Sequence, residues 1–447
     1  MTWIQKHRLK RYIRDSIWIG PVSGMVAALV VVRVLRLIDH WVGWEVNFDA
    51  DTARTVLITL TSAMLTFVVF LSSALLIALQ LASAQLSPRI IGLVFRDPVT
   101  KFTMTWFVFT DALSLAAVLR VTDSVPALTV YVSAYSCVLS LALFLYLIDH
   151  IGRILRPATA VRVVARLGRK VIESVYPLTL NEFNAQFDSH PLSLTARVAD
   201  EPPKTVVSFK DGVILACDVE GLVAVARSFH CVLELVPQVG DFIGRGDTLF
   251  RVYAGEGGPS ADALRSMVAI GQERSLEQDP SFAFRILVDI ASKALSPAIN
   301  DPTTAVLAID QLQYLLSVVG GRHLDDERVR EASGQTRLLR RTPGWEAFVR
   351  LAVTEVRQFG ASSIQVCRRL HALLNALLRT LPPERSAVLQ RELELLRRTT
   401  IRSFPEPADQ ALALQMDSLG VGGGQTSHPD EAADNTAPAQ SEAVATS

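Results

Sequence analysis

The hydrophobic positions follow two different patterns along the chain. In the first 150 residues they form four long apolar runs, each meeting the roughly 20 residues that a helix needs to cross a membrane. These runs are residues 17–38, 55–85, 102–121 and 127–148. The second run has no charged residue from Thr55 through Pro88, and at about 1.5 Å per residue it is longer than a bilayer core is thick. We therefore predict a four-helix transmembrane domain over residues 1–153, in which the second helix continues beyond the bilayer.

The charges beside these runs predict an orientation. Lysine and arginine gather before the first run, between the second and third, and after the fourth, whereas acidic residues dominate the loop after the first run. Because basic flanks stay on the cytoplasmic side, we expect a multi-pass protein of the bacterial inner membrane with both termini in the cytoplasm. The basic start also suits a signal peptide, but the first run is long and has no clear small-x-small cleavage site, which favours an uncleaved anchor.

Beyond residue 153 the pattern predicts a cytoplasmic α+β region. Residues 154–203 are expected to form a basic helical connector. Residues 204–254, with short β-branched runs and Asp-Gly turns, predict a small β module. Its V-G-D-x-x-x-x-G-D-x-L-F pattern, which begins at Val239, is similar to the turn of barrel-sandwich hybrid domains, the fold of biotinyl and lipoyl carriers. Lys210 does not match the carrier motif, so we expect a structural module.

The remainder of the chain is predicted to be a helical domain, residues 255–402, and a disordered acidic tail, residues 403–447. Pro297 and Pro302 cannot lie in a helix interior, so the segments on either side of them predict two helices joined by a tight turn. Three further amphipathic helices are expected near 344–358, 361–380 and 383–399. After Arg402 the chain has seven acidic residues and no basic one, which is typical of disorder. The fold class expected is mainly α.

Composition agrees with an integral membrane protein. Half of the 447 residues are hydrophobic and 20% are charged, and the mean hydropathy is +0.30, which is too apolar for an ordinary soluble globule. The 44 basic and 44 acidic residues cancel, so no overall field attracts nucleic acid. Arginine pairs in the last helices are interspersed with glutamates, which favours solvated helix faces or an oligomer surface over a nucleic-acid site.

Two stretches resemble a known family. They are Q-L-A-S-A-Q-L-S-P-R-I-I-G-L-V-F-R-D-P, residues 80–98, and A-S-K-A-L-S-P-A-I-N-D-P-T-T-A, residues 291–305. Both are similar to the signatures of a bacterial family of predicted membrane proteins known as domain of unknown function 2254. The resemblance covers most of the chain and implies an inner-membrane protein with four N-terminal spans and a cytoplasmic domain. It implies no activity and no site residues.

Asp111 lies near the middle of the third run, where a carboxylate costs roughly 2.5 to 3.5 kcal/mol. On the second run, polar residues gather on one helix face, mostly at heptad spacing: Thr59, Ser62, Thr66, Ser73 and Gln80. Counting residues from each side of the core places Thr66 and Asp111 at similar depth. We expect either a polar pathway lined by Asp111 and this stripe, or interhelical packing through small hydroxyl side chains.

Two cytoplasmic segments are further candidate sites. The loop between the second and third runs holds Arg89, Arg96 and Asp97. It is expected to bind a lipid phosphate, to contact the soluble domain, or only to carry the orientation signal. The turn between the two predicted cytoplasmic helices holds a second set, whose members suit either helix capping or a ligand site: Lys293, Ser296, Asn300 and Asp301.

The sequence has no G-x-x-x-x-G-K-[ST], H-E-x-x-H or G-x-S-x-G motif. We therefore expect no enzyme, and no catalytic, cofactor-binding or metal-binding residue. The predicted function is an oligomeric channel or transporter-like protein for ions or small solutes, with a cytoplasmic regulatory domain. The alternative is a non-conducting membrane-anchored sensor or scaffold that acts through its cytoplasmic domain on an unidentified partner. The lipid bilayer and further copies of the chain are the expected partners, and nucleic acid is not.

Overall fold

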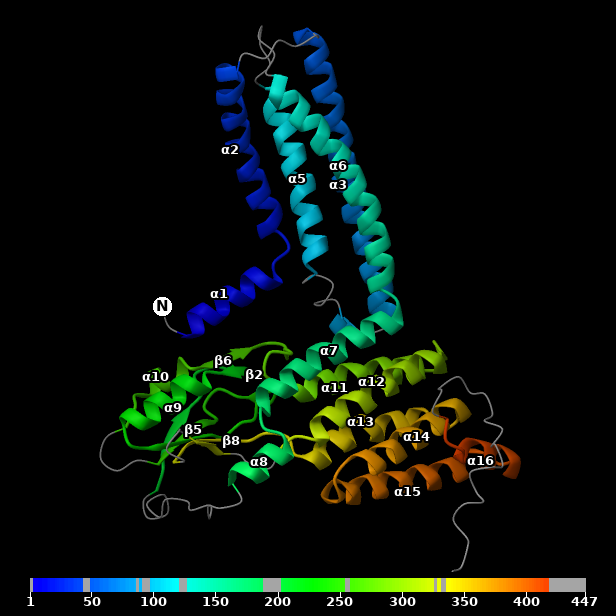
Figure 1. Cartoon of the computed structure of the whole chain (residues 1–447). Coiled ribbons are helices and arrows are strands. Elements are labelled where there is room, and N and C mark those ends of the chain that lie inside the picture. The colour runs from blue at the N-terminus through cyan, green and yellow to red at the C-terminus, as the bar shows by residue number, and fades with distance from the viewer. Residues whose placement is uncertain are drawn as a thin grey trace, which may run out of the picture.

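The computed structural model describes residues 3–42, 49–85, 88–90, 97–119, 127–187, 202–253, 258–324, 328–330 and 335–417. Most of these residues are helical, as predicted. The molecule has two storeys (Figure 1): long helices stand side by side in the upper one, and a sheet-containing part and a helical domain lie next to each other below them.

The upper storey consists of α2 (Ile19–Val42), α3 (Ala50–Gln85), α5 (Pro98–Val118) and α6 (Ala127–Ile154). Three of them, α2, α3 and α6, are long and apolar enough to cross a membrane. The third predicted span forms α5, which is not among these three. α5 carries Lys101 and Asp111 and packs against the other three helices. A helix that contacts protein on several sides is less exposed to lipid and tolerates more polar residues.

Small residues let α2 pack closely on α5. A Cβ atom added to Gly24 would lie 2.7 Å from the backbone oxygen of Thr105, and one on Gly20 would meet the hydroxyl of the same threonine. Further along α2, Ala28 and Val32 are buried against α5. This spacing of four residues, with glycine at the tightest points, is typical of closely packed membrane helices.

Two of the long helices continue into the helical domain. α3 has 36 residues and is therefore about 54 Å long. Leu79 of α3 packs on the hydrophobic core of the helical domain, and so do Ile154 and Leu155 at the end of α6. The upper storey and the helical domain are thus joined by shared apolar packing as well as by the chain itself.

The helical domain contains the helices predicted from the sequence between residues 282 and 399. They are α11 (Pro280–Ala294), α12 (Pro302–Gly320), α13 (Trp345–Phe359), α14 (Ile364–Thr380) and α15 (Ser386–Ser403), with the short 3-10 helix η3 (Pro383–Arg385) before α15. α11 and α12 confirm the predicted helix, turn and helix. α13 to α15 confirm the three amphipathic helices.

Two segments that were predicted to lie outside the helical domain pack against it. The connector predicted over 154–203 contains α7 (Pro157–Val175), whose apolar face is buried against α11 and α12, and α8 (Leu180–Phe187). α7 is therefore part of the helical domain. In the tail predicted to be disordered from residue 403, α16 (Pro407–Leu414) packs on α14 and α15. The sequence analysis did not predict this helix because its few apolar residues hardly change the polar composition of the tail as a whole. Residues 418–447 lie outside the described residues.

The sheet-containing part has a five-stranded sheet of order β1-β5-β3-β8-β7 and a three-stranded sheet of order β4-β2-β6. The strands are β1 (Lys204–Val207), β2 (Gly212–Cys217), β3 (Val232–Leu235), β4 (Phe242–Ile243), β5 (Thr248–Tyr253), β6 (Val268–Gly271), β7 (Arg328–Arg330) and β8 (Thr336–Arg340). The helices of this part are α9 (Val219–Ser228) and α10 (Ala261–Arg265). Residues from both sheets share one apolar core.

The predicted β module, residues 204–254, holds only the first five of these strands. β6 pairs with β2, and β8 pairs in parallel with β3, with Leu233 opposite Leu338. The other three strands, β6 to β8, come from the stretch expected to be wholly helical, because no local pattern links strands that are far apart in the chain. The similarity to barrel-sandwich domains stays a prediction. Lys210 donates a hydrogen bond of 2.7 Å from Nζ to the carbonyl oxygen of Ile270.

One helix precedes the first long helix. α1 (Trp3–Asp15) lies between the upper storey and the three-stranded sheet (Figure 1). Trp3 packs against the cluster formed by Leu215, Ala216 and Ala269 of that sheet. At its other end, the carbonyl oxygen of Arg14 accepts a hydrogen bond of 2.6 Å from Lys101 Nζ of α5. α1 therefore contacts both storeys.

Candidate functional site

Two candidate segments singled out from the sequence, the loop after α3 and the turn after α11, meet where α3 reaches the helical domain. The 3-10 helix η1 (Pro88–Ile90) follows α3, and its Arg89 forms an ion pair with Asp289 of α11. The Arg89 guanidinium also lies 5.8 Å from the ring centroid of Phe282. Lys293 Nζ donates a hydrogen bond of 2.7 Å to the carbonyl oxygen of Ser83 in the last turn of α3. We call these five residues the junction.

The chemistry of the junction follows from the end of a helix. The last carbonyl groups of α3 lack partners within the helix and carry the negative end of its dipole, so an ammonium group such as that of Lys293 is favourable there. Burial lowers the pKa of Arg89, and the positive charges of Arg285 and Arg274 add to this effect. The carboxylate of Asp289 provides the opposite charge that keeps the Arg89 guanidinium in place.

An ion-pair chain extends the junction to α13. Arg285 donates from Nε to Asp289 at 2.7 Å and binds both carboxylate oxygens of Glu355, at 2.5 and 2.6 Å. This paired geometry lowers the pKa of Glu355 and raises that of Arg285, so both groups stay charged at neutral pH. The contacts therefore connect the end of α3 with α11 and, through Arg285, with α13.

The other residues of the predicted turn have structural roles. Asp301 caps α12 by accepting a hydrogen bond of 3.0 Å from the backbone NH of Thr304. Asn300 has a φ of 47°, a left-handed conformation that asparagine adopts more readily than most residues. The hydroxyl of Ser296 donates to the carbonyl oxygen of Lys293 at 2.7 Å. Of the four candidates in the turn, Lys293 is the one whose side chain contacts α3.

The remaining loop candidates differ from Arg89. Asp97 caps α5, because its carboxylate accepts hydrogen bonds of 2.8 Å from both the backbone NH and the hydroxyl of Thr100. The same carboxylate lies 3.1 Å from His150 Nε2 of α6. Asp97 therefore holds the start of α5 to the end of α6. Arg96 lies outside the described residues.

The predicted stripe on α3 faces outward in the single chain. All five of its residues are exposed: Thr59, Ser62, Thr66, Ser73 and Gln80. The residues of α3 that are buried include Leu57, Met64 and Leu71, which precede Thr59, Thr66 and Ser73 by two positions. Two positions correspond to about 200° around a helix, so the stripe faces away from the neighbouring helices. The hydroxyls of those three stripe residues donate to carbonyl oxygens four residues earlier, at 2.8 to 3.0 Å.

A second line of polar side chains, which sequence reasoning missed, is buried inside the upper storey. We call it the polar seam, and its members are Thr103, Thr110 and Ser114 of α5 and Thr129, Ser133, Ser136 and Ser140 of α6. The hydroxyl of Ser140 lies 3.4 Å from that of Thr110, and Trp106 Nε1 lies 3.5 Å from the carbonyl oxygen of Ser136. The spacings of three, four and seven residues, which put each helix's members on one face, were the available signal.

Asp111 follows Thr110 on α5 and is half-buried. Phe107 packs in one cluster with Met64, and Ala117 packs in another with Leu57, so Asp111 lies level with α3 between residues 57 and 64. This is close to the depth of Thr66, but Thr66 points outward. Within the part of the chain that the structure describes, no hydrogen-bond partner approaches Asp111 Oδ1 or the hydroxyls of Thr103, Ser114 and Ser133. Asp111 therefore follows a member of the polar seam along α5, whereas the stripe on α3 faces away from the neighbouring helices.

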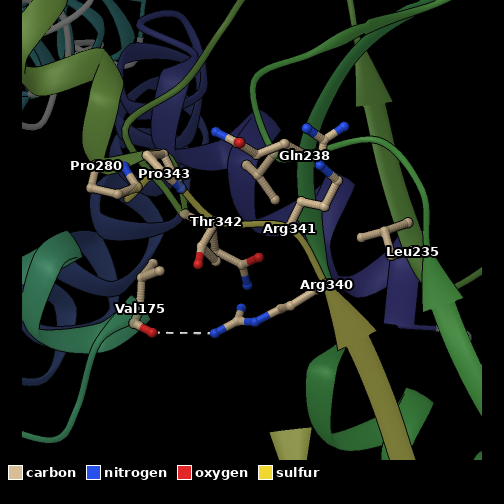
Figure 2. Close-up of a pocket in the computed structure, with 10 residues that line it drawn as sticks. Val175, Leu235, Gln238, Pro280, Arg340, Arg341, Thr342 and Pro343 are labelled. Atoms are coloured by element: carbon tan, nitrogen blue, oxygen red, sulfur yellow. Dashed lines mark hydrogen bonds between the residues drawn. The ribbon is translucent and has the colours of Figure 1, made fainter. Parts of the chain in front are cut away.

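A small pocket lies between the sheets and the helical domain. Figure 2 shows Arg340, at the end of β8, pointing toward Val175 of α7, while Arg341 extends beside Gln238. Arg340 Nη2 donates to the carbonyl oxygen of Val175 at 3.2 Å. The cavity measures about 20 Å³, close to the space that one water molecule occupies. Arg340 thus joins the sheets to the helical domain. A cavity of this size is too small for a ligand larger than water.

Two of the buried titratable groups in the helical domain, Asp279 and His371, have strongly shifted pKa values. Asp279 caps α11 by accepting a hydrogen bond of 3.1 Å from the backbone NH of Phe282, and burial raises its pKa to about 6. Burial also lowers the pKa of His371 on α14 to about 4, helped by the positive charge of Arg397. Among the described residues there is no group of three or more His, Cys, Asp or Glu side chains that could hold a metal ion.

Comparisons with known proteins agree with the resemblance found in the sequence. A family model described as "Predicted membrane protein (DUF2254)" matches residues 14–376. Curated relatives include uncharacterized proteins of Mycobacterium bovis and Mycobacterium tuberculosis, each 27% identical over 428 residues, which cover 90% of this chain and 80% of the relative. No solved structure matches the chain. Because the family model matches well over half of the chain, the protein belongs to this bacterial family of predicted membrane proteins, known as domain of unknown function 2254.

Proposed function

We propose that the protein is an oligomeric channel or transporter-like protein for ions or small solutes, and that its cytoplasmic part regulates it. The observation that supports this proposal is the polar seam beside Asp111. A carboxylate and unpaired hydroxyls are costly inside a membrane, and small hydroxyl side chains alone would suffice for close packing of α5 and α6. Carboxylate and hydroxyl oxygens are also groups that can replace the hydration shell of a cation.

The proposal includes the topology predicted from the sequence. In it, α5 is a fourth span at the centre of the bundle, the membrane is the bacterial inner membrane, and both termini are cytoplasmic. The proposal needs no catalytic residue, cofactor or nucleic acid.

Flux measurements in liposomes test this proposal and separate the two polar lines. The purified chain is reconstituted, and K⁺, Na⁺ and H⁺ fluxes are measured over a range of voltage and membrane tension. Thr110→Val alters the seam and Asp111→Asn alters the carboxylate that follows it on α5; we call these two the seam variants. Thr66→Val makes the same kind of change as Thr110→Val on the outward stripe and serves as the matched control. We expect the two seam variants to change flux at least about tenfold, the effect of about 1.4 kcal/mol on a barrier, and the control to leave it unchanged.

Three outcomes would count against the proposal as stated. Liposomes that stay tight under all conditions would exclude conduction. Flux that is the same in the wild type and in both seam variants would remove Asp111 and the seam from the path. Flux changed only by Thr66→Val would place the path between copies, along α3.

The junction favours a second candidate, a non-conducting sensor or scaffold that acts through its cytoplasmic domain. The Arg89 and Lys293 contacts, with Arg285 and Glu355 beyond them, connect α3 to α11 and α13. Under this hypothesis, tight liposomes are expected, and Asp289→Asn should speed amide hydrogen exchange in α13 of the full-length protein. Unchanged exchange in α13 would remove the junction as a route of coupling.

A further inference from the structure

α1 is held to the three-stranded sheet by one face. Trp3 packs on the apolar cluster of that sheet, and His7 Nε2 lies 2.9 Å from Glu277 Oε2. Arg11 continues the same face, at positions i, i+4 and i+8, and its guanidinium lies close to Gly271 of β6. This docked face is therefore already occupied by protein.

The opposite face of α1 is apolar and exposed. Leu9, Tyr12 and Ile13 are 46%, 54% and 51% exposed, and their spacing places them on one side of the helix. At about 100° per residue, Lys6 and Lys10 lie along one edge of this strip and Arg8 along the other, and all three are exposed. An apolar strip bordered by basic residues is typical of helices that lie in a membrane interface.

The position of α1 places this strip at the end of the long helices. α1 ends at Asp15 and α2 begins at Ile19, so the two are separated by about one helical turn. Trp18, 55% exposed, lies edge to face with Tyr12 at 6.4 Å. Lys101, in the first turn of α5, donates a hydrogen bond to the carbonyl oxygen of Arg14. If α2 spans the membrane, α1 lies at its cytoplasmic surface.

The neighbouring sheet continues the same surface. Val213 of β2 belongs to the cluster that Trp3 contacts, and Val213 is paired with Phe242 of the antiparallel strand β4. Paired residues of antiparallel strands point to the same face, so Phe242, 71% exposed, extends the apolar surface beside α1. Burial lowers the pKa of Lys210, and the nearby charge of Arg8 adds to this effect. Two cations are thus close together at the edge of this surface.

We propose that the exposed face of α1, together with Phe242 and Lys210, binds the anionic phospholipids of the cytoplasmic leaflet and holds the three-stranded sheet against the membrane. Charge complementarity and continuity with α2 favour lipid over a second copy or a soluble protein. α1 has five basic residues and one acidic residue, Asp15, which pairs with Arg11. Each cation near an anionic surface contributes about a fivefold factor to binding. The inference rests on α2 as a span, as proposed above, and does not depend on conduction.

Quenching by brominated lipids in vesicles tests this inference on the full chain. A bimane label is placed at L9C and, as a water-facing control, at D262C, because the Asp262 side chain on α10 is 93% exposed. The chain without either substitution, labelled in parallel, measures the background from the native cysteines. Each protein is reconstituted in vesicles of phosphatidylcholine alone and in vesicles with roughly 30% phosphatidylglycerol, both brominated in the acyl chains.

We expect bimane at position 9 to be quenched at least about twofold more than at position 262. Quenching at position 9 should increase with phosphatidylglycerol, and a Lys6→Gln, Arg8→Gln, Lys10→Gln variant should lose this increase. Equal quenching at the two positions, or a disulfide between L9C residues of two copies, would overturn the inference. If quenching at position 9 does not change with the phosphatidylglycerol content, the proposal that α1 recognises anionic lipid is wrong. Tight liposomes in the flux assay would leave this result unaffected, so the two proposals fail independently.

Discussion

Replacing Asp279 by asparagine should reveal a pH dependence of stability that the wild-type chain largely conceals. The pKa of Asp279 is raised from 3.8 to about 6 by burial, a difference that corresponds to about 3 kcal/mol. Because the folded carboxyl binds its proton more tightly than the unfolded one, this group destabilises the fold progressively as pH rises from about 4 to 6. Asparagine keeps the cap, since its side-chain oxygen also accepts from the NH of Phe282.

His371 produces the opposite slope over nearly the same range. Its pKa is lowered from 6.5 to about 4, so the unfolded chain takes up a proton below pH 6.5 that the folded chain does not. The fold therefore loses about 3 kcal/mol as pH falls from 6.5 to 4. In the wild type, this loss is offset by the protonation of Asp279. Without Asp279, the loss remains.

Urea unfolding of the full chain in detergent, followed by tryptophan fluorescence between pH 4 and pH 7, measures these slopes. Relative to the wild type, Asp279→Asn should lose about 3 kcal/mol on going from pH 7 to pH 4, and His371→Asn should gain a similar amount. The double variant should run nearly parallel to the wild type, because the two sites lie on different helices and their effects should add. Parallel curves for the wild type and Asp279→Asn would refute the reasoning.

Three further experiments test the packing of two helices and the strength of one ion pair. Gly24→Leu places a side chain within 2.7 Å of the backbone of α5, and overpacking of this kind costs about 1 to 3 kcal/mol, so thermal unfolding in detergent should begin at a lower temperature. A double-mutant cycle between Arg89→Gln and Asp289→Asn, read from urea unfolding, should give a coupling below about 1 kcal/mol, because the Arg89 side chain is 45% exposed. Ala413→Asp puts a charge at a fully buried position of α16, which should release this helix and accelerate its cleavage in limited proteolysis.

Each of these predictions has a result that would contradict it. Ser23→Leu changes the exposed neighbour of Gly24, and Leu412→Asp changes an exposed position of α16, so both should behave like the wild type. If either control is as destabilised as its partner, close packing is not the cause. A coupling between Arg89 and Asp289 well above 1 kcal/mol would mean that the pair is shielded from water more than its exposure indicates.

The helices of this protein were largely predictable because their signals are local. The uncharged run that begins at Thr55 predicted a helix to Gln85, and α3 ends at Gln85. Pro297 and Pro302 predicted the break between α11 and α12, because proline is excluded from a helix interior. By contrast, α1 was not predicted: its basic residues were interpreted only as an orientation signal.

Which polar line is buried was not predictable in the same way. The stripe on α3 and the seam on α5 and α6 have the same local signature, hydroxyl residues repeated on one helix face. The neighbours of each helix decide which face is covered, and α5 lies between the others. Asp111 was identified as a candidate from its position in an apolar run, but its half-buried environment depends on how α5 packs among the other helices.

The sequence by itself determined the membrane character, the lengths of most helices and the chemistry of individual candidates, because apolar runs, prolines and caps act over a few residues. Only the tertiary structure decided how distant segments meet. Arg89 and Asp289 are two hundred positions apart and form an ion pair, and β3 and β8 pair across about one hundred residues. Contacts of this kind depend on how whole elements pack, because each surface is selected by the shape and charge of the surface opposite it.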